Sequence, residues 1–71
     1  MATRVEAHIT GTIWKVEVAV GDQVDEGQTL VIIESLKMDM PVEAAASGRV
    51  ESIVVSPGQA VEEGALLLTL A

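Results

Sequence analysis

This sequence predicts an all-β fold made of two similar halves, and three observations carry the prediction. β-branched residues are abundant, since the 71 residues include eleven Val, five Ile and five Thr, and such side chains favour strands over helices. No stretch of ten residues shows a helical apolar period. When the chain is shifted by 37 positions, residues 5–33 align with residues 42–70. At this length residues 1–71 allow one small domain.

The repeat between the halves is clearest at glycine. Ten of the 29 aligned pairs are identical, and three of these are glycine pairs. The glycine pairs are Gly11/Gly48, Gly21/Gly58 and Gly27/Gly64. A glycine that recurs at equivalent positions indicates a shared backbone conformation rather than a shared bias in composition, because glycine adopts positive φ without steric cost. We therefore predict that the last two pairs form equivalent turns at positive φ, in halves related by a two-fold rotation.

Each half is predicted to be a set of short strands separated by turns. In the first half, residues 3–9 alternate between apolar and polar side chains, and residues 13–18 form a longer strand after a glycine. A very short strand surrounds Val24, and residues 30–33 close the half. The alternation of the first strand places His8 on its polar face, which predicts a surface histidine.

The second half repeats this order with strands over residues 48–55, around Val61 and over residues 66–70. Pro57-Gly58 suits a type II turn, because proline is favoured at its second position and glycine at its third. Two half-sheets of this kind are expected to bury their apolar faces against each other. The result is a small β-sandwich or flattened barrel with approximate two-fold symmetry.

The segment between the halves, Glu34 to Pro41, is expected to be a tight hairpin that joins residues 30–33 to residues 40–44. Two-residue hairpin turns need positive φ and favour Asn or Gly, yet Ser35 to Met38 contains neither. Leucine or lysine at positive φ costs about 1 kcal/mol or more each. Residues that contradict local backbone preferences are expected mainly at functional sites, so we predict that this hairpin is functional. An ordinary hairpin with a solvated lysine and core methionines is the competing interpretation.

The composition excludes several classes of function. A net charge of −7 with four basic residues argues against nucleic-acid binding. The apolar runs are too short for a membrane span, and no leader opens the chain, so cytoplasm is the expected location. One His and no Cys give no metal site. A second His, a Ser–His pair and a phosphate-binding loop are also missing, so no catalytic residues are predicted.

The segment "ESLKMDM" resembles the biotin-attachment motif, Glu-Ala/Ser-Met-Lys-Met, of the biotinyl/lipoyl attachment domains. The resemblance covers nearly the whole chain. "GTIWKVEVAVGDQVDEGQTLVIIESLKM" is similar to the first half of the biotin carboxyl carrier members, and "SGRVESIVVSPGQAVEEGALLLTL" to their second half. It implies a barrel-sandwich hybrid: a flattened β-barrel of two four-stranded antiparallel sheets, with the modified lysine at the tip of the hairpin between the halves.

By this resemblance Lys37 is the one acylated lysine and carries biotin through an amide on its side-chain nitrogen, flanked by the recognition residues Glu34, Ser35, Leu36 and Met38. A biotin protein ligase would attach the group and supply the base that frees the amine. The implied partners after that are a biotin carboxylase and a carboxyltransferase, between which the carrier moves a carboxyl group. The carrier itself catalyses nothing.

Leu36 departs from the family pattern, in which methionine usually precedes the lysine. The leucine leaves open the attachment of lipoate in place of biotin, or of both groups, whereas Met38 indicates biotin. An unmodified structural adaptor is the remaining alternative. We expect Leu36 and Met38 to be exposed and to serve recognition rather than the fold. Trp14 is expected to be a half-exposed packing residue, or else to face a partner. A chain from Met1 to its final strand fits a standalone carrier, and an excised domain would look the same.

Overall fold

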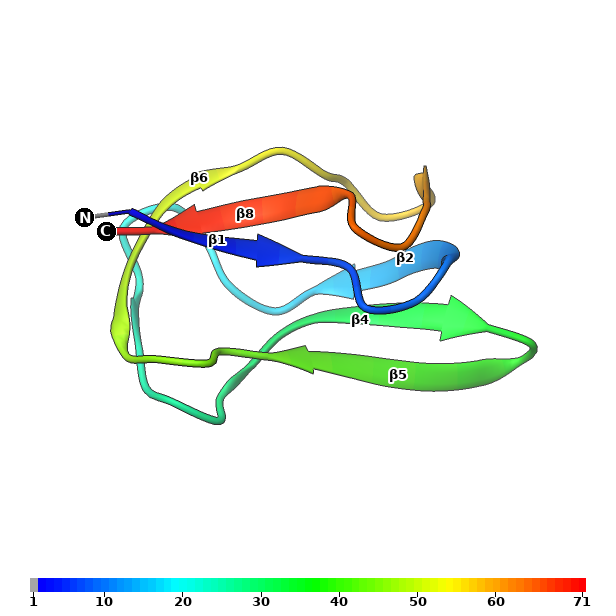
Figure 1. Ribbon diagram of the computed structural model, residues 1–71, viewed down its shortest axis with the longest axis horizontal. Coiled ribbons are helices and arrows are strands. Elements are labelled where there is room, and N and C mark those ends of the chain that lie inside the picture. The colour runs from blue at the N-terminus through cyan, green and yellow to red at the C-terminus, as the bar shows by residue number, and fades with distance from the viewer. Residues whose placement is uncertain (1) are drawn as a thin grey trace.

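The computed structural model describes residues 2–71, and these residues form eight strands and no helix (Figure 1). The strands are β1 (Thr3–Glu6), β2 (Gly11–Val16), β3 (Gln23–Val24), β4 (Thr29–Ser35), β5 (Met38–Glu43), β6 (Gly48–Ile53), β7 (Ala60–Val61) and β8 (Leu66–Leu70). They build two four-stranded sheets with strand orders β1-β8-β6-β3 and β5-β4-β2-β7, in which all neighbouring strands are antiparallel. The predicted all-β class with two four-stranded antiparallel sheets is confirmed. The two sheets do not join into a closed barrel.

The two halves of the chain interlock in a way that the strand order along the sequence did not specify. Each sheet takes two strands from each half: β1 and β3 lie with β6 and β8, and β5 and β7 lie with β2 and β4. The two-residue strands β3 and β7 cross over to pair with β6 and β2. Alternating side chains specify which face of a strand is buried, but they do not specify which strand lies beside it.

The predicted two-fold relation is confirmed in the backbone. Replacing each strand by its counterpart 37 residues away converts one strand order into the other. The N–H of Gly21 donates to the carbonyl of Val50 over 2.8 Å, and the equivalent N–H of Gly58 donates to the carbonyl of Ile13 over 2.7 Å. Register shifts also recur, since Trp14 and its counterpart Glu51 are each the extra residue of a bulge. The repeat therefore extends to local irregularities.

Glycine has two distinct roles in this fold. Positive φ occurs at Gly21 (96°), Gly27 (86°), Gly58 (90°) and Gly64 (90°), as predicted. A Cβ added at any of these four would meet nothing within 4 Å, so a side chain there is disfavoured by the backbone conformation alone. At Gly11 and Gly48, by contrast, a Cβ would lie 2.5 Å from the carbonyl oxygen of Glu34 and 2.9 Å from that of Ala71. These two glycines allow neighbouring strands to approach closely.

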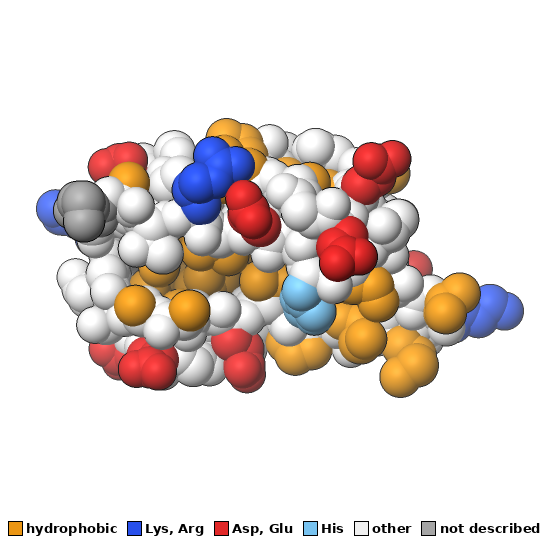
Figure 2. Space-filling view, viewed as in Figure 1, with side chains coloured by type: hydrophobic (Ala, Val, Ile, Leu, Met, Phe, Trp, Pro, Cys, Tyr) orange, Lys and Arg blue, Asp and Glu red, His pale blue; other side chains and the backbone are white. Residues whose placement is uncertain are grey.

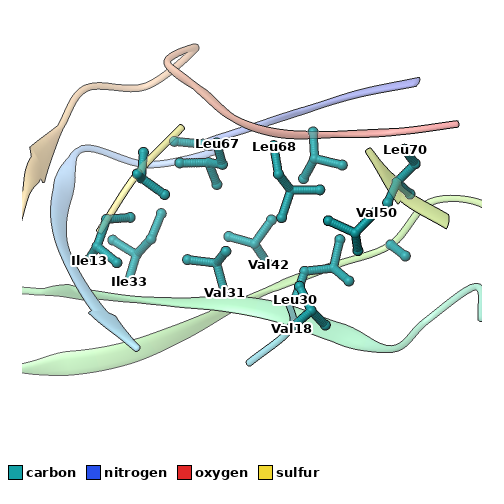
Figure 3. Packing of buried hydrophobic residues seen from close by; sticks show 14 of the residues in the cluster. Ile13, Val18, Leu30, Val31, Ile33, Val42, Val50, Leu67, Leu68 and Leu70 are labelled. Atoms are coloured by element: carbon teal, nitrogen blue, oxygen red, sulfur yellow. The ribbon is translucent and has the colours of Figure 1, made fainter. Parts of the chain in front are cut away.

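The core between the sheets is aliphatic throughout. Side chains from both sheets point toward one another, as Figure 3 shows for ten labelled residues. The largest side chains with less than 2% exposure are Ile13, Leu30, Ile33, Leu67, Leu68, Leu70, Val24, Val31 and Val50. No polar or charged side chain of the described residues is buried. Each such aliphatic residue contributes about 1.5–3 kcal/mol on burial, so the fold is held by hydrophobic packing.

Candidate functional site

The hairpin formed by β4 and β5 projects beyond the rest of the sandwich, at the end opposite to the two chain ends (Figure 1). Its strands pair as far as Ser35 opposite Met38. Only Leu36 and Lys37 are left to make the turn. The tight hairpin predicted for Glu34 to Pro41 is confirmed, and strand pairing continues along most of that segment.

The turn is formed by residues in a conformation that ordinarily belongs to glycine or asparagine. Leu36 has φ of 52° and Lys37 has φ of 63°. They are the only non-glycine residues with positive φ in residues 2–71. Positive φ at both central positions is the geometry of a type I′ turn, which matches the twist of the paired strands. The predicted positive φ is confirmed, at a cost of roughly 1–2 kcal/mol per residue.

Three consecutive side chains at the tip are open to solvent. Leu36 is 92% exposed and Met38 is 61% exposed, so the expectation that they lie outside the core is confirmed. Lys37 between them is exposed, and it makes no ion pair with any residue of the described part of the chain. Its amine is thus accessible from solvent.

The other lysine, Lys15, lies in a different setting. It sits within β2, where its Nζ is 3.3 Å from a carboxylate oxygen of Glu17. Its backbone has neither the positive φ nor the projecting position of Lys37. The two lysines of the chain therefore differ in both backbone geometry and charge environment.

Two carboxylates face each other just behind the turn. Glu34 on β4 lies directly opposite Asp39 on β5, and both are exposed. Like charges directly opposite in a sheet destabilise the pairing. Asp39 was not singled out in the sequence, because its position across from Glu34 follows only once the turn is known to contain two residues.

The hollow on the open side of the sandwich, visible in Figure 2, lies away from the lysine. It has a volume of about 240 Å³, and its walls include Val5 on β1 and Val42 on β5. His8 lines it and is exposed, which confirms a surface histidine. Lys37 is not among its lining residues. Figure 2 also shows hydrophobic side chains gathered toward the hairpin end.

No helix among residues 2–71 is long and apolar enough to cross a membrane. Within the same range, no three His, Cys, Asp or Glu residues come together in a way that could hold a metal ion.

Trp14 is 53% exposed, which confirms its predicted half-exposed position.

Fold and hairpin together define a class of small β-sandwich that presents one exposed lysine on a strained turn at its end. Comparison with known proteins gives the family. Residues 2–70 match the family described as "Biotin-requiring enzyme", and the chain belongs to this family.

The relatives place this domain both alone and within larger proteins. The chain is 42% identical over 66 residues to the biotin/lipoyl attachment protein of Bacillus subtilis (93% of this chain, 90% of the relative). It is 46% identical over 70 residues to the biotin carboxyl carrier protein of Streptococcus mutans (99% of this chain, 54% of the relative). The crystal structure of the Kluyveromyces lactis urea carboxylase superposes with a TM-score of 0.95 at 38% identity, covering 100% of this chain and 6% of that one.

Proposed function

We propose that this protein is a covalent biotin carrier and that Lys37 holds biotin through an amide on Nζ. The observation that carries the proposal is the setting of this lysine: exposed, without an ion-pair partner among residues 2–71, and held at φ of 63° at the tip of a projecting hairpin. Membership in a family described by its biotin requirement supports the cofactor. Residues 1–71 act as one attachment domain in this proposal.

The residues present fit the cofactor. Amide formation needs a primary amine that another enzyme can reach, and Lys37 is exposed between Leu36 and Met38, with Glu34 and Ser35 preceding it. Its ammonium group must lose a proton before the nitrogen can attack an acyl carbon. We assign the base for that step to a biotin protein ligase, because no side chain of residues 2–71 hydrogen-bonds to the amine.

In this role the chain positions the cofactor and performs no chemistry itself. Biotin, when attached, supplies the nitrogen that carries a carboxyl group from one active site to another. The sandwich holds the root of Lys37 in a fixed place, because β4 and β5 are paired up to the turn, and the side chain beyond it is free to move. We assign the two active sites to a biotin carboxylase and a carboxyltransferase, and the location to the cytoplasm.

The lipoyl alternative raised by Leu36 is not favoured. The family description names biotin alone and the Streptococcus mutans relative is named for biotin, whereas the Bacillus subtilis relative is named for both groups. An unmodified adaptor is disfavoured for a physical reason: two strained, exposed residues at a turn stabilise neither the fold nor the hairpin.

The test is the mass of the protein after co-expression with a biotin protein ligase in medium that contains biotin. We expect one biotin adduct per chain, mapped to Lys37 by peptide analysis and absent from Lys37→Arg. Lys15→Arg is the matched control and should be modified fully. An adduct on Lys15, an adduct that persists in Lys37→Arg, or a lipoyl adduct in its place would refute the proposal.

A further inference from the structure

The outer faces of the two sheets are related by the two-fold axis, yet they differ in chemistry. On the sheet that carries the hairpin, three apolar residues occupy outward positions: Trp14 on β2, Ile32 on β4 and Pro41 on β5. We call them the outer patch. Their neighbours Ile13, Ile33 and Val42 are buried, which places the patch on the opposite side of the sheet from the core.

The equivalent positions of the other sheet are polar. The counterparts of the outer patch, 37 residues away, are Glu51, Thr69 and Arg4. Arg4 pairs with Glu6, with 3.1 Å between Nε and Oε2, and the hydroxyls of Thr69 and Ser52 lie 2.7 Å apart. The same backbone thus accepts polar residues at all three of these positions. The apolar character of the outer patch is therefore not a requirement of the fold.

The residue at one edge of the patch is the only aromatic of the chain. Trp14 is 53% exposed, although burying it would stabilise the fold. Tryptophan is enriched among the residues that dominate binding energies at protein interfaces. The outer patch, an exposed tryptophan with Ile32 and Pro41, therefore resembles the apolar centre of a protein interface.

The patch is continuous with the lysine hairpin. Ile32 lies opposite Pro41 and three residue pairs behind the pair that closes the turn, which is about 10 Å along the strands at 3.3 Å per residue. A partner surface of ordinary size, about 800 Å², covers both the tip and the patch. Between them lie the facing carboxylates of Glu34 and Asp39. A partner complementary to this surface is expected to have an apolar depression with Lys or Arg residues at its border.

We infer that the outer patch is a docking surface for the ligase that acylates Lys37, an inference that rests on the proposed function. Before modification, only four methylene groups separate the amine of Lys37 from the backbone. The ligase must therefore bring its own surface against the hairpin, and the outer patch extends that contact. After modification the longer arm reaches other active sites without the same requirement. The continuity of the outer patch with the tip favours the ligase, because the ligase is the partner that must contact the tip itself.

The test compares steady-state biotinylation of unmodified variants by a biotin protein ligase with biotin and ATP. Trp14→Glu and Ile32→Thr introduce residues similar to those the fold accepts at equivalent positions, so both should melt close to the unchanged protein. Each should raise KM for the carrier at least about tenfold, as expected for an interface centre, while kcat changes little. Glu51→Ala, at the counterpart of Trp14, is the matched control and should leave both constants unchanged. Should Trp14→Glu fail to fold, Ile32→Thr and Pro41→Arg carry the test.

Three outcomes overturn the inference. The first is a KM that stays within about twofold in Ile32→Thr and Trp14→Glu, since an interface centre contributes more than that. The second is unchanged ligase kinetics with slower carboxylation of the modified carrier, which assigns the patch to the carboxylase. The third is self-association that Trp14→Glu abolishes. A wild-type chain that acquires no adduct on Lys37 refutes the proposed function, and is distinguished from these three by the missing product.

Discussion

Positive φ occurs in two regions of this protein that solve the same backbone problem in different ways. Four glycines adopt it in the turns of the sandwich, where a Cβ would have open space around it. At the hairpin tip a leucine and a lysine adopt it instead. Glycine removes the conformational cost, so the tip keeps a strain that the other turns avoid. The glycine turns meet the needs of the fold without strain, whereas under the proposed function the strained tip presents Lys37.

The largest expected effect lies at the tip. Replacing Lys37 with Arg should abolish biotinylation, because a guanidinium is always protonated in proteins and does not act as an acyl acceptor. The melting temperature should stay unchanged, since surface substitutions change stability by at most about 0.5 kcal/mol. Intact mass and a thermal melt on the same sample check both parts. A melting temperature that falls by several degrees would show that the tip contributes to the fold after all.

The reverse pattern is expected in a glycine turn. Gly58→Val should destabilise the domain by about 1–2 kcal/mol or more, because valine pays the full cost of positive φ. For a domain of this size each kcal/mol lowers the melting temperature by roughly 4–8 °C. Below the transition the variant should still be biotinylated normally. A Gly58→Val protein as stable as the original would mean that the turn changes conformation at little cost.

A smaller effect separates strain from recognition at the tip itself. Leu36→Asn should stabilise the domain by about 0.5–1 kcal/mol, because asparagine tolerates the left-handed region and suits the first position of a type I′ turn. The same change removes an apolar side chain that is 92% exposed, so modification should become slower. Chemical denaturation and ligase kinetics on the same variant test the two parts. A gain in both stability and ligase efficiency would contradict the recognition role of Leu36.

The smallest effect overall is expected for Leu36→Met, which restores the methionine of the family pattern. Both side chains are unbranched at Cβ and similar in volume, so the free energy of unfolding should change by less than about 0.5 kcal/mol. The modified protein should become a better substrate for carboxylation, measured as the rate of carboxyl transfer at equal carrier concentration. A faster reaction accompanied by a large stability change would assign the gain to the fold rather than to recognition.

Much of this architecture was accessible from local patterns. Turn glycines, strand alternation and the 37-residue repeat predicted the all-β class, the four positive-φ glycines and the exposed hairpin with Lys37 at its tip. These features follow from the sequence because each depends on the conformation of a few neighbouring residues. The family resemblance of the residues around Lys37 added the cofactor.

The tertiary structure decided which segments meet. Strand exchange between the halves placed β3 beside β6 and β7 beside β2, and the two-residue turn placed Glu34 opposite Asp39. The bulge at Trp14 matters as well: strict alternation from the buried Ile13 would turn Lys15 inward, whereas both Trp14 and Lys15 are exposed. Strand pairing and bulges depend on contacts between residues far apart in the chain, and one extra residue reverses the faces of those that follow. The outer patch beside the lysine hairpin therefore became visible only in the folded molecule.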